Sequence, residues 1–455
     1  MKNITQLLII LLGFYCFSQD GQLDGSFNPT LNLNNSVRTI IEQPDGKILI
    51  GGWFTTSGSH KIIRLNEDGS EDGSFNHVSG FNGSINALAI QSDNKIIVGG
   101  GYPAFLKRVN EDGTLDSSFN AAVDVDGRIT SIKIVSDNKI MVAGIFNNIN
   151  GVSIQSLARL NTDGSVDTSF NANLPPVTFI WDFEIQTDNK IIISGQNDAG
   201  NQYRIFTRYN SNGSIDSTFL ADGLSADSYI YDLEIDKDGK ILISGPFNNF
   251  NYNTRYSLAR LNNNGTLDNT FNSYNLPHNG TTHTIFGVRI LDDGKYFING
   301  TFSEYDGIES NSIAKINNDG TIDNSFNIGT GPNQYVWNSY IQQDGKILIG
   351  GDFTEYNGTA INRIARLGNT ILSTDENTFV QEILVYPNPF KNFINIDNTN
   401  NANILVSIYN LTGQIIKTET VNQFKTMDTQ ALSSGIYFAH ISDGKNLYIA
   451  KLVKK

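Results

Sequence analysis

Two carboxylates stand at matching positions of neighbouring repeats and are the residues best suited to acid–base chemistry. Asp182 follows Trp181, and Asp232 follows Tyr231. If the two carboxylates approach each other, they could hold a cation, bind a sugar hydroxyl or form the carboxylate pair of a glycosidase. Nothing in the sequence fixes their separation, and ordinary packing is the simpler interpretation.

Aromatic residues in loops are the second feature that indicates binding. They occur with many Asn and Asp residues at Trp53, Tyr102, Phe105, Tyr203, Phe250, Tyr252, Tyr256, Tyr305 and Tyr356. Such groups suit stacking on sugar rings or holding a peptide, although loops packing on one another would use the same residues. The candidate ligand-binding set is Trp53, Tyr102, Trp181, Asp182, Tyr231, Asp232, Tyr252, Tyr256, Tyr305, Trp337 and Tyr356.

Signals for catalysis or metal binding are otherwise weak. His278 and His283 form the only close histidine pair and have no third ligand nearby. The segments 124–127 and 236–239 resemble calcium loops but lack the later Glu. No zincin, phosphate loop or nucleophile elbow is present. The sequence therefore predicts no catalytic residue and no cofactor, with calcium left open.

Charge and the N-terminus limit the partners and the compartment. A net charge of −14 argues against nucleic acid and anionic membranes. Residues 1–18 have the basic start, apolar run and small residue of a secretory signal peptide, and no later run is long enough for an integral membrane segment. The single cysteine, Cys16, lies inside that signal, so the mature chain has no disulfide.

A turn with a lysine recurs about every 50 residues and predicts the fold. Asp-Gly and Asp-Asn supply the positive φ of a tight hairpin, and β-branched alternating segments flank each copy. A third strand of the Leu-Ala-Arg-Leu type and a fourth with Asp-x-Ser/Thr-Phe follow, which is the pattern of a propeller blade. The turn lysines are Lys47, Lys95, Lys139, Lys190, Lys240, Lys295 and Lys346.

The ends of this array predict a closed ring. The fourth-strand motif first occurs alone at residues 23–28, before any hairpin, whereas the seventh unit ends at Leu367 without one. The N-terminal strand should therefore complete the last of seven blades within residues 19–368 and cover two exposed edges. We expect the recurring Asp, Ser and Phe to be architectural and the turn lysines to be solvated.

Function is expected where the blades differ. The links from second to third strand and from blade to blade are long and varied, and a meander places both kinds on one face. On the first strand, the position nine residues before each turn lysine also varies widely. It holds Arg38, Asn86, Thr130, Trp181, Tyr231, Phe286 and Trp337.

The repeats resemble the delta-60 type repeats of bacterial secreted proteins. The segments 43–54 and 63–76 follow that repeat pattern almost throughout, and the resemblance covers about residues 22–368. It implies the propeller fold but no agreed biochemical activity.

After a polar linker at 369–381, residues 382–455 form a second domain of short alternating strands, which predicts a small Ig-like β-sandwich. This domain resembles the C-terminal sorting domain of the type IX secretion system of Bacteroidetes-type bacteria. The resemblance implies the secretion machinery as a partner and a secreted or outer cell-surface location. The motif residues are Tyr386, Pro387, Asn388, Pro389, Gly413, Gly435, Tyr437, Lys454 and Lys455.

The sequence therefore predicts an all-β chain, a seven-bladed β-propeller followed by a small Ig-like sandwich. The main functional hypothesis is a non-enzymatic protein that binds a glycan or a protein through its variable-loop face. Two alternatives stay open: an enzyme acting on extracellular polysaccharide through acidic residues at the channel mouth, and a purely structural or adhesive surface protein.

Overall fold

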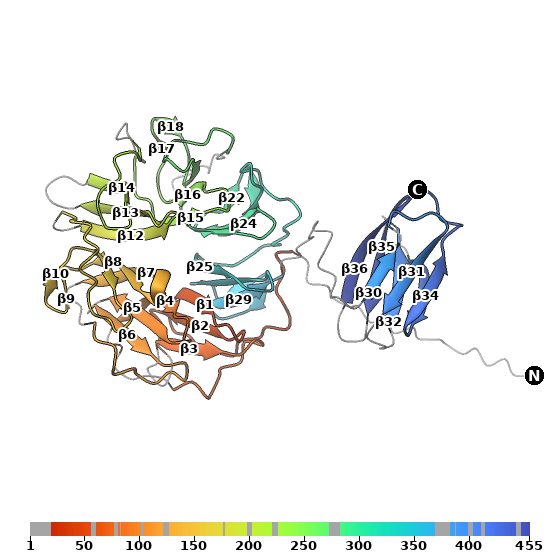
Figure 1. Cartoon of the computed structure of the whole chain (residues 1–455), viewed down its shortest axis with the longest axis horizontal. Helices are drawn as coiled ribbons and strands as arrows, with labels where there is room; N and C mark the ends of the chain where they lie inside the picture. Colours follow the sequence, from red (N-terminus) through yellow and green to blue (C-terminus); the bar gives the residue numbers. More distant parts are fainter. Residues whose placement is uncertain are drawn as a thin grey trace, which may run out of the picture. The chain divides into compact units, whose positions relative to one another are not determined.

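The computed structural model describes residues 20–368 and 383–455 apart from short gaps (Figure 1). The gaps are 56–60, 77–80, 82, 102–103, 122–126, 176–177, 198–202, 221–225, 273–282, 387, 399–403, 411–414 and 443–446. The predicted signal peptide, residues 1–18, and the predicted linker, residues 369–381, lie outside the described residues. Contacts divide the chain into two compact units between Ile371 and Leu372. The described residues form strands and one short 3₁₀ turn, Ser136–Asn138, so the predicted all-β class is confirmed.

Unit 1 contains seven antiparallel blades, each built on three main strands. The first strands are β1 (Val37–Glu42), β4 (Ser84–Ile90), β7 (Arg128–Ile134), β12 (Thr178–Ile185), β15 (Asp232–Ile235), β20 (Ile285–Ile290) and β25 (Val336–Ile341). The second strands are β2 (Ile48–Gly52), β5 (Ile96–Gly101), β8 (Ile140–Ile145), β13 (Ile191–Asn197), β16 (Ile241–Ser244), β21 (Tyr296–Gly300) and β26 (Ile347–Gly351). The third strands are β3 (Ile62–Leu65), β6 (Phe105–Val109), β11 (Leu157–Leu160), β14 (Tyr203–Tyr209), β19 (Leu258–Leu261), β24 (Ile313–Ile316) and β29 (Ile364–Leu367).

The fourth strand of each blade is shorter than predicted. It is reduced to a single bridge to the third strand, as between Leu65 and Glu71 in blade 1. The reason is local, because Asp72 directly after the bridge accepts hydrogen bonds from the backbone N–H and the hydroxyl of Ser74. This Asx turn bends the chain away and ends the ladder.

The blades surround a common axis. Each first strand contacts the first strands of the two neighbouring blades, and β25 contacts β1. Seven apolar clusters hold the ring, each joining one blade to the next; Leu49 and Ile62 of blade 1, for example, pack with Ile85 of blade 2. Phe75 from the fourth-strand motif completes that cluster. The expectation that the recurring Phe is architectural is therefore confirmed, since Phe75 fills space between two blades.

The N-terminal strand closes the ring as predicted. Leu23 bridges Leu367 of β29, and Asp24 N–H donates to the carbonyl of Arg366 at 2.8 Å. Phe27 lies in the cluster that combines Leu348 and Ile364 of blade 7 with β1 and β2 of blade 1. The first and last blades are therefore joined by the same kinds of contact as any other pair.

A charged clamp recurs on the outer side of the blades, and it corrects the expectation that the turn lysines are only solvated. In blade 1, the Asp72 carboxylate forms ion pairs with Lys47 Nζ at 2.8 Å and with Arg64 Nε at 2.7 Å. The guanidinium of Arg64 lies over the ring of Phe75. All seven turn lysines pair with the motif Asp in this way, including Lys346 with Asp24 across the closure. Each clamp arginine also donates to a carbonyl of the next blade, as Arg159 does to Ser211 at 2.9 Å.

Small two-stranded hairpins, which the sequence analysis did not predict, occupy four of the links between second and third strands. They are β9 (Asn148–Ile149) with β10 (Val152–Ser153), β17 (Asn249–Phe250) with β18 (Asn253–Thr254), β22 (Glu304–Tyr305) with β23 (Ile308–Glu309), and β27 (Glu355–Tyr356) with β28 (Thr359–Ala360). Asn-Gly or Asp-Gly forms three of the four turns, with Gly151 at φ +75°.

Unit 2 is the predicted β-sandwich. One sheet has the order β30-β31-β34 and the other β33-β32-β35-β36. Phe390, Ile396, Val406, Ala439 and Leu452 lie in its core. The strands are β30 (Ile383–Tyr386), β31 (Phe393–Asn398), β32 (Ile404–Tyr409), β33 (Ile415–Val421), β34 (Phe424–Asp428), β35 (Gly435–Ser442) and β36 (Leu447–Lys454). Within the described part of the chain, no helix is long and apolar enough to cross a membrane.

Candidate functional site

A β-bulge near the start of the first strand sets the position of the varied residues. In six blades the ladder between first and second strand skips one residue, for example between Ile180 and Asp182, so that Trp181 has no partner on β13. In the remaining blade, Tyr231 directly precedes β15. Bulges re-aim side chains next to functional sites. We name the residues at this position the bulge ring: Arg38, Asn86, Thr130, Trp181, Tyr231, Phe286 and Trp337.

A glycine on the second strand makes room for each bulge. A Cβ on Gly195 would lie 2.3 Å from the carbonyl oxygen of Phe179, and one on Gly351 would lie 2.1 Å from that of Tyr335. The corresponding glycines of the other five blades meet a carbonyl oxygen at the same close range. Their recurrence thus has a physical cause, since only glycine lets the two backbones approach this closely.

Four consecutive members of the bulge ring form a continuous aromatic arc across blades 4 to 7. Ring centroids are 4.8 Å apart for Trp181 and Tyr231, 6.2 Å for Tyr231 and Phe286, and 4.3 Å for Phe286 and Trp337. All four side chains are half-buried. The indole Nε1 of Trp181 is buried without a hydrogen-bond partner among the described residues.

A second row of aromatic rings extends the arc two residues earlier in the same blades, with Phe179 on β12 and with Tyr229 and Tyr335 shortly before β15 and β25. Phe179 lies 4.2 Å from Trp181, Tyr229 stacks on Tyr231 at 6.2 Å, and Tyr335 meets Trp337 at 6.2 Å. Tyr335 is 45% exposed. We use "aromatic arc" for Phe179, Trp181, Tyr229, Tyr231, Phe286, Tyr335 and Trp337.

The rest of the bulge ring is polar. Asn86 donates to the carbonyl of Ile129 at 3.1 Å, and Thr130 donates to that of Ile180 at 2.7 Å, so both short side chains tie neighbouring blades together. Arg38 lies between the rings of Trp53 and Trp337, 4.1 and 3.7 Å from their centroids. A ligand at this end of the axis would therefore meet aromatic faces with an arginine at each end of the arc, Arg38 beside Trp337 and Arg128 at 4.6 Å from the Phe179 ring centroid.

Asp182 and Asp232 each bind the next blade. Asp182 accepts from the backbone N–H of Leu233 at 3.1 Å, and Asp232 accepts from that of Val288 at 2.9 Å. Arg289 also donates to Asp232 at 3.0 Å. These contacts support a structural role for both carboxylates, directly below the aromatic arc.

Further along the same strands lies a line of alternating charges from blades 3 to 6. Lys133 pairs with Glu184, and Arg289 pairs with Glu234 at 3.3 Å as well as with Asp232. Burial raises the pKa of Glu234, and Glu184 and Asp232 add to this, while Arg289 and Lys133 oppose it. Burial also raises the pKa of Asp232 against the pull of Arg289. The carboxylates therefore hold their protons more strongly than exposed ones do.

The other predicted ligand residues do not converge on this place. Tyr305 and Tyr356 are buried, with hydroxyl groups donating to the carbonyls of Gly320 and Gly21, so they belong to the core and are removed from the candidate set. Tyr256 packs half-buried against the cluster between blades 5 and 6. Tyr252 is 89% exposed at the tip of the β17–β18 hairpin.

Part of the candidate set cannot be placed, and part of the site was missed. Tyr102, His278 and the acidic residues of segment 124–127 lie outside the described residues. The sequence analysis omitted Phe179, Tyr229 and Tyr335 from the candidates. They stand two residues before a bulge residue, and the two-residue alternation of side chains in β structure was the signal that could have found them.

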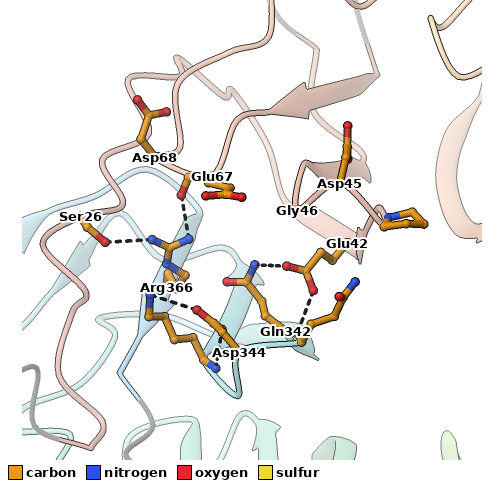
Figure 2. Close-up of a pocket in the computed structure, with 12 residues that line it drawn as sticks. Ser26, Glu42, Asp45, Gly46, Glu67, Asp68, Gln342, Asp344 and Arg366 are labelled. Atoms are coloured by element: carbon orange, nitrogen blue, oxygen red, sulfur yellow. Dashed lines mark hydrogen bonds and ion pairs between the residues drawn. The ribbon is translucent and has the colours of Figure 1, made fainter. Parts of the chain in front are cut away.

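The opposite face has a hollow of about 630 Å³ at the closure between blades 7 and 1 (Figure 2). Arg366, which lines it, donates to Ser26 and to the carbonyl of Glu67. Glu42 accepts from Gln342 and from the N–H of Gln343, both at 2.8 Å. Because these groups are engaged in joining the two blades, we assign the hollow to the closure. Across the described segments, no group of three or more His, Cys, Asp or Glu residues is arranged to hold a metal ion.

Seven blades closed by the N-terminal strand define unit 1 as a seven-bladed β-propeller. The chain belongs to the DUF5122 β-propeller family, a domain of unknown function, as the earlier resemblance implied. The family model matches seven segments: 43–75, 91–119, 136–170, 186–219, 237–271, 291–326 and 342–369.

Residues 384–455 match the secretion system C-terminal sorting domain. The protein is exported by the type IX secretion system to the cell surface or beyond. In unit 2, Tyr386 ends β30, Asn388 accepts from Val453 N–H at 2.9 Å, and the buried Lys454 lies over Phe390. Tyr437 donates to Ser433 at 2.9 Å. Pro387 and Gly413 lie outside the described residues.

Solved structures are similar to this chain at low sequence identity. The extracellular domain of a putative hybrid two-component system from B. thetaiotaomicron is 16% identical with a TM-score of 0.51, over 86% of this chain and 46% of that one. PorZ, a surface component of the type IX secretion system of Porphyromonas gingivalis, is 12% identical with a TM-score of 0.44, over 95% and 61%. This chain thus spans less than two thirds of either. No curated protein matches the sequence.

Proposed function

We propose that this exported propeller is a non-enzymatic binding protein that takes a glycan on the aromatic arc. The observation that carries the proposal is the arc itself, in which half-buried rings of four adjacent blades follow one another at 4.3 to 6.2 Å. Flat apolar faces with few polar groups among them suit the apolar faces of pyranose rings. The arc also stands where the blades differ most, which fits a ligand site better than architecture.

The test uses the mature chain against arrays of bacterial, plant and host glycans, with and without calcium. We expect a specific hit whose affinity falls about tenfold or more in Trp181→Ala, since stacked aromatic contacts dominate such sites. Tyr252→Ala is the matched control, because this exposed aromatic lies on a hairpin outside the arc. Loss of binding in Tyr252→Ala with full binding in Trp181→Ala would move the site to the hairpins. A blank array would shift the proposal to a protein ligand.

One observation favours an enzyme as the second candidate. The raised pKa values of Asp232 and Glu234 are what a general acid near neutral pH needs. Their pairing with Arg289 weighs against that role. Release of reducing ends from a polysaccharide, abolished by Asp232→Asn or Asp182→Asn with the fold intact, would favour this candidate over a binding protein.

A further inference from the structure

Arg38 occupies an unusual place at the end of the aromatic arc. It comes from the bulge of β1, and its guanidinium lies between the indole rings of Trp53 and Trp337. Trp337 in turn stacks on Phe286 at an interplanar angle of 14°. The result is a four-layered stack of Phe286, Trp337, Arg38 and Trp53 that crosses from blade 6 to blade 1.

The polar edge of this guanidinium is not used within the fold. Arg38 donates no hydrogen bond to any residue that the structure describes, and its Nε is buried without a partner. The clamp arginines differ sharply, since Arg64 reaches a carboxylate, a hydroxyl and a carbonyl at once. A half-buried cation without a paired anion is costly, so an external counter-charge would be favoured here.

Among the described residues, Asp352 is the carboxylate whose charge acts on Arg38, and it is already engaged in other contacts. Asp352 accepts from Trp337 Nε1 at 2.7 Å and from the hydroxyl of Ser36. It thereby holds the indole that forms one wall of the stack. Burial lowers the pKa of Arg38 to about 10 and Asp352 opposes this, so the guanidinium stays protonated at neutral pH.

The geometry restricts what can bind. Trp53 and Trp337 both lie close to the guanidinium carbon, with centroids at 4.1 and 3.7 Å, so the guanidinium has its planar fork of N–H groups left to offer a ligand. That planar fork matches a carboxylate, which can accept two parallel hydrogen bonds. The aromatic arc continues directly from Trp337, so a sugar ring stacked there would have its substituents beside Arg38.

We infer that Arg38 recognises the carboxylate of a uronic acid residue in a glycan bound along the aromatic arc. This rests on the proposed function and adds the chemical class of the sugar to it. Because the chain has a net charge of −14, it repels an acidic ligand overall, and binding such a ligand requires a local cationic group.

Calorimetric titration of the mature chain would test this with three probes: an oligogalacturonate, its carboxyl-reduced neutral counterpart and a sulfated galactan oligosaccharide. The uronate should bind at least about tenfold more tightly than the neutral probe, and more weakly as salt rises. Arg38→Gln should lose about 10- to 100-fold for the uronate, the range of a charge-assisted bidentate contact, and nothing for the neutral probe. Arg255→Gln is the matched control and should bind like the parent.

Arg38→Lys keeps the charge but not the fork, so it should recover only part of the uronate affinity. Unfolding midpoints of both variants show whether the fold is retained, and Arg38→Lys carries the test if Arg38→Gln does not fold. Equal binding of uronate and neutral probes, or an unchanged Arg38→Gln, would overturn the inference and leave glycan binding standing. Preference for the sulfated probe would overturn the carboxylate assignment. No binding of any saccharide would instead remove the proposed function.

Discussion

The outer clamp and the bulge ring follow opposite rules in one propeller. The clamp repeats the same partners in every blade, with a turn lysine on the motif Asp and, in six blades, an arginine beside it. The bulge ring has the same backbone in nearly every blade but changes its side chain from arginine to amide, hydroxyl and aromatic. The comparison teaches that uniform side chains hold this ring together, while a uniform bulge presents varied side chains at the proposed binding site.

Low pH should have the largest effect on stability, because the seven Asp residues of the clamp titrate together. Burial would raise the pKa of Asp24, but Ser26, Arg366 and Lys346 outweigh it and lower the pKa to about 2. A carboxylate with a lowered pKa stabilises the fold above about pH 4 and loses that contribution as the pH falls toward 2. Asp24 alone accounts for about 2 kcal/mol. Urea unfolding at pH 7 and pH 3 should show the loss, and equal midpoints would contradict it.

Removing one clamp carboxylate comes next in size. Asp24→Ala leaves the buried Arg366 without its anion, so the free energy of unfolding should fall by about 3–5 kcal/mol. Asp45→Ala is the control, because its exposed side chain lies in the neighbouring turn and belongs to no clamp. Chemical denaturation measures both. If the two variants were equally stable, the N-terminal strand would not hold the ring closed.

Closing the space behind a bulge should affect both regions. Gly195→Ala places a Cβ against the carbonyl oxygen of Phe179. Because a backbone carbonyl cannot move aside as a flexible side chain can, the free energy of unfolding should fall by about 1–3 kcal/mol. The near-UV circular dichroism of Trp181 should change with it. Gly73→Ala has open space around its Cβ and should leave both signals as they are. An unchanged signal in Gly195→Ala would show that the bulge does not position the arc.

The smallest effect is a gain in stability on the variable face. Tyr252 has φ +61° at the turn position where the other three hairpins carry glycine. Tyr252→Gly should therefore stabilise the protein by up to about 1 kcal/mol, and Gly151→Tyr should destabilise it by a similar amount. Thermal unfolding compares the pair. A loss of stability in Tyr252→Gly would show that this tyrosine packs rather than stands free for contacts.

Much of the fold was predictable because its signals are local. Asp-Gly-Lys and Asp-Asn-Lys turns, flanked by alternating β-branched residues, identified seven hairpins, and the orphan motif at 23–28 predicted the closing strand that pairs with β29. The short hairpins were missed although Asn150-Gly151 and Asn357-Gly358 are tight-turn pairs with positive φ at glycine. Their strands of two residues are too short for a periodic pattern to stand out.

For the site, the sequence by itself determined which position varies from blade to blade, and it identified Trp181, Tyr231 and Trp337 as candidates. Only the tertiary structure decided which aromatic residues meet: the arc joins residues about 50 positions apart, whereas Tyr305 and Tyr356 turn into the core. The sequence also gave no sign that the clamp lysines form ion pairs whereas Arg38 forms none with a described residue. Ring closure brings distant strands together, and burial and pairing depend on those neighbours rather than on residue type.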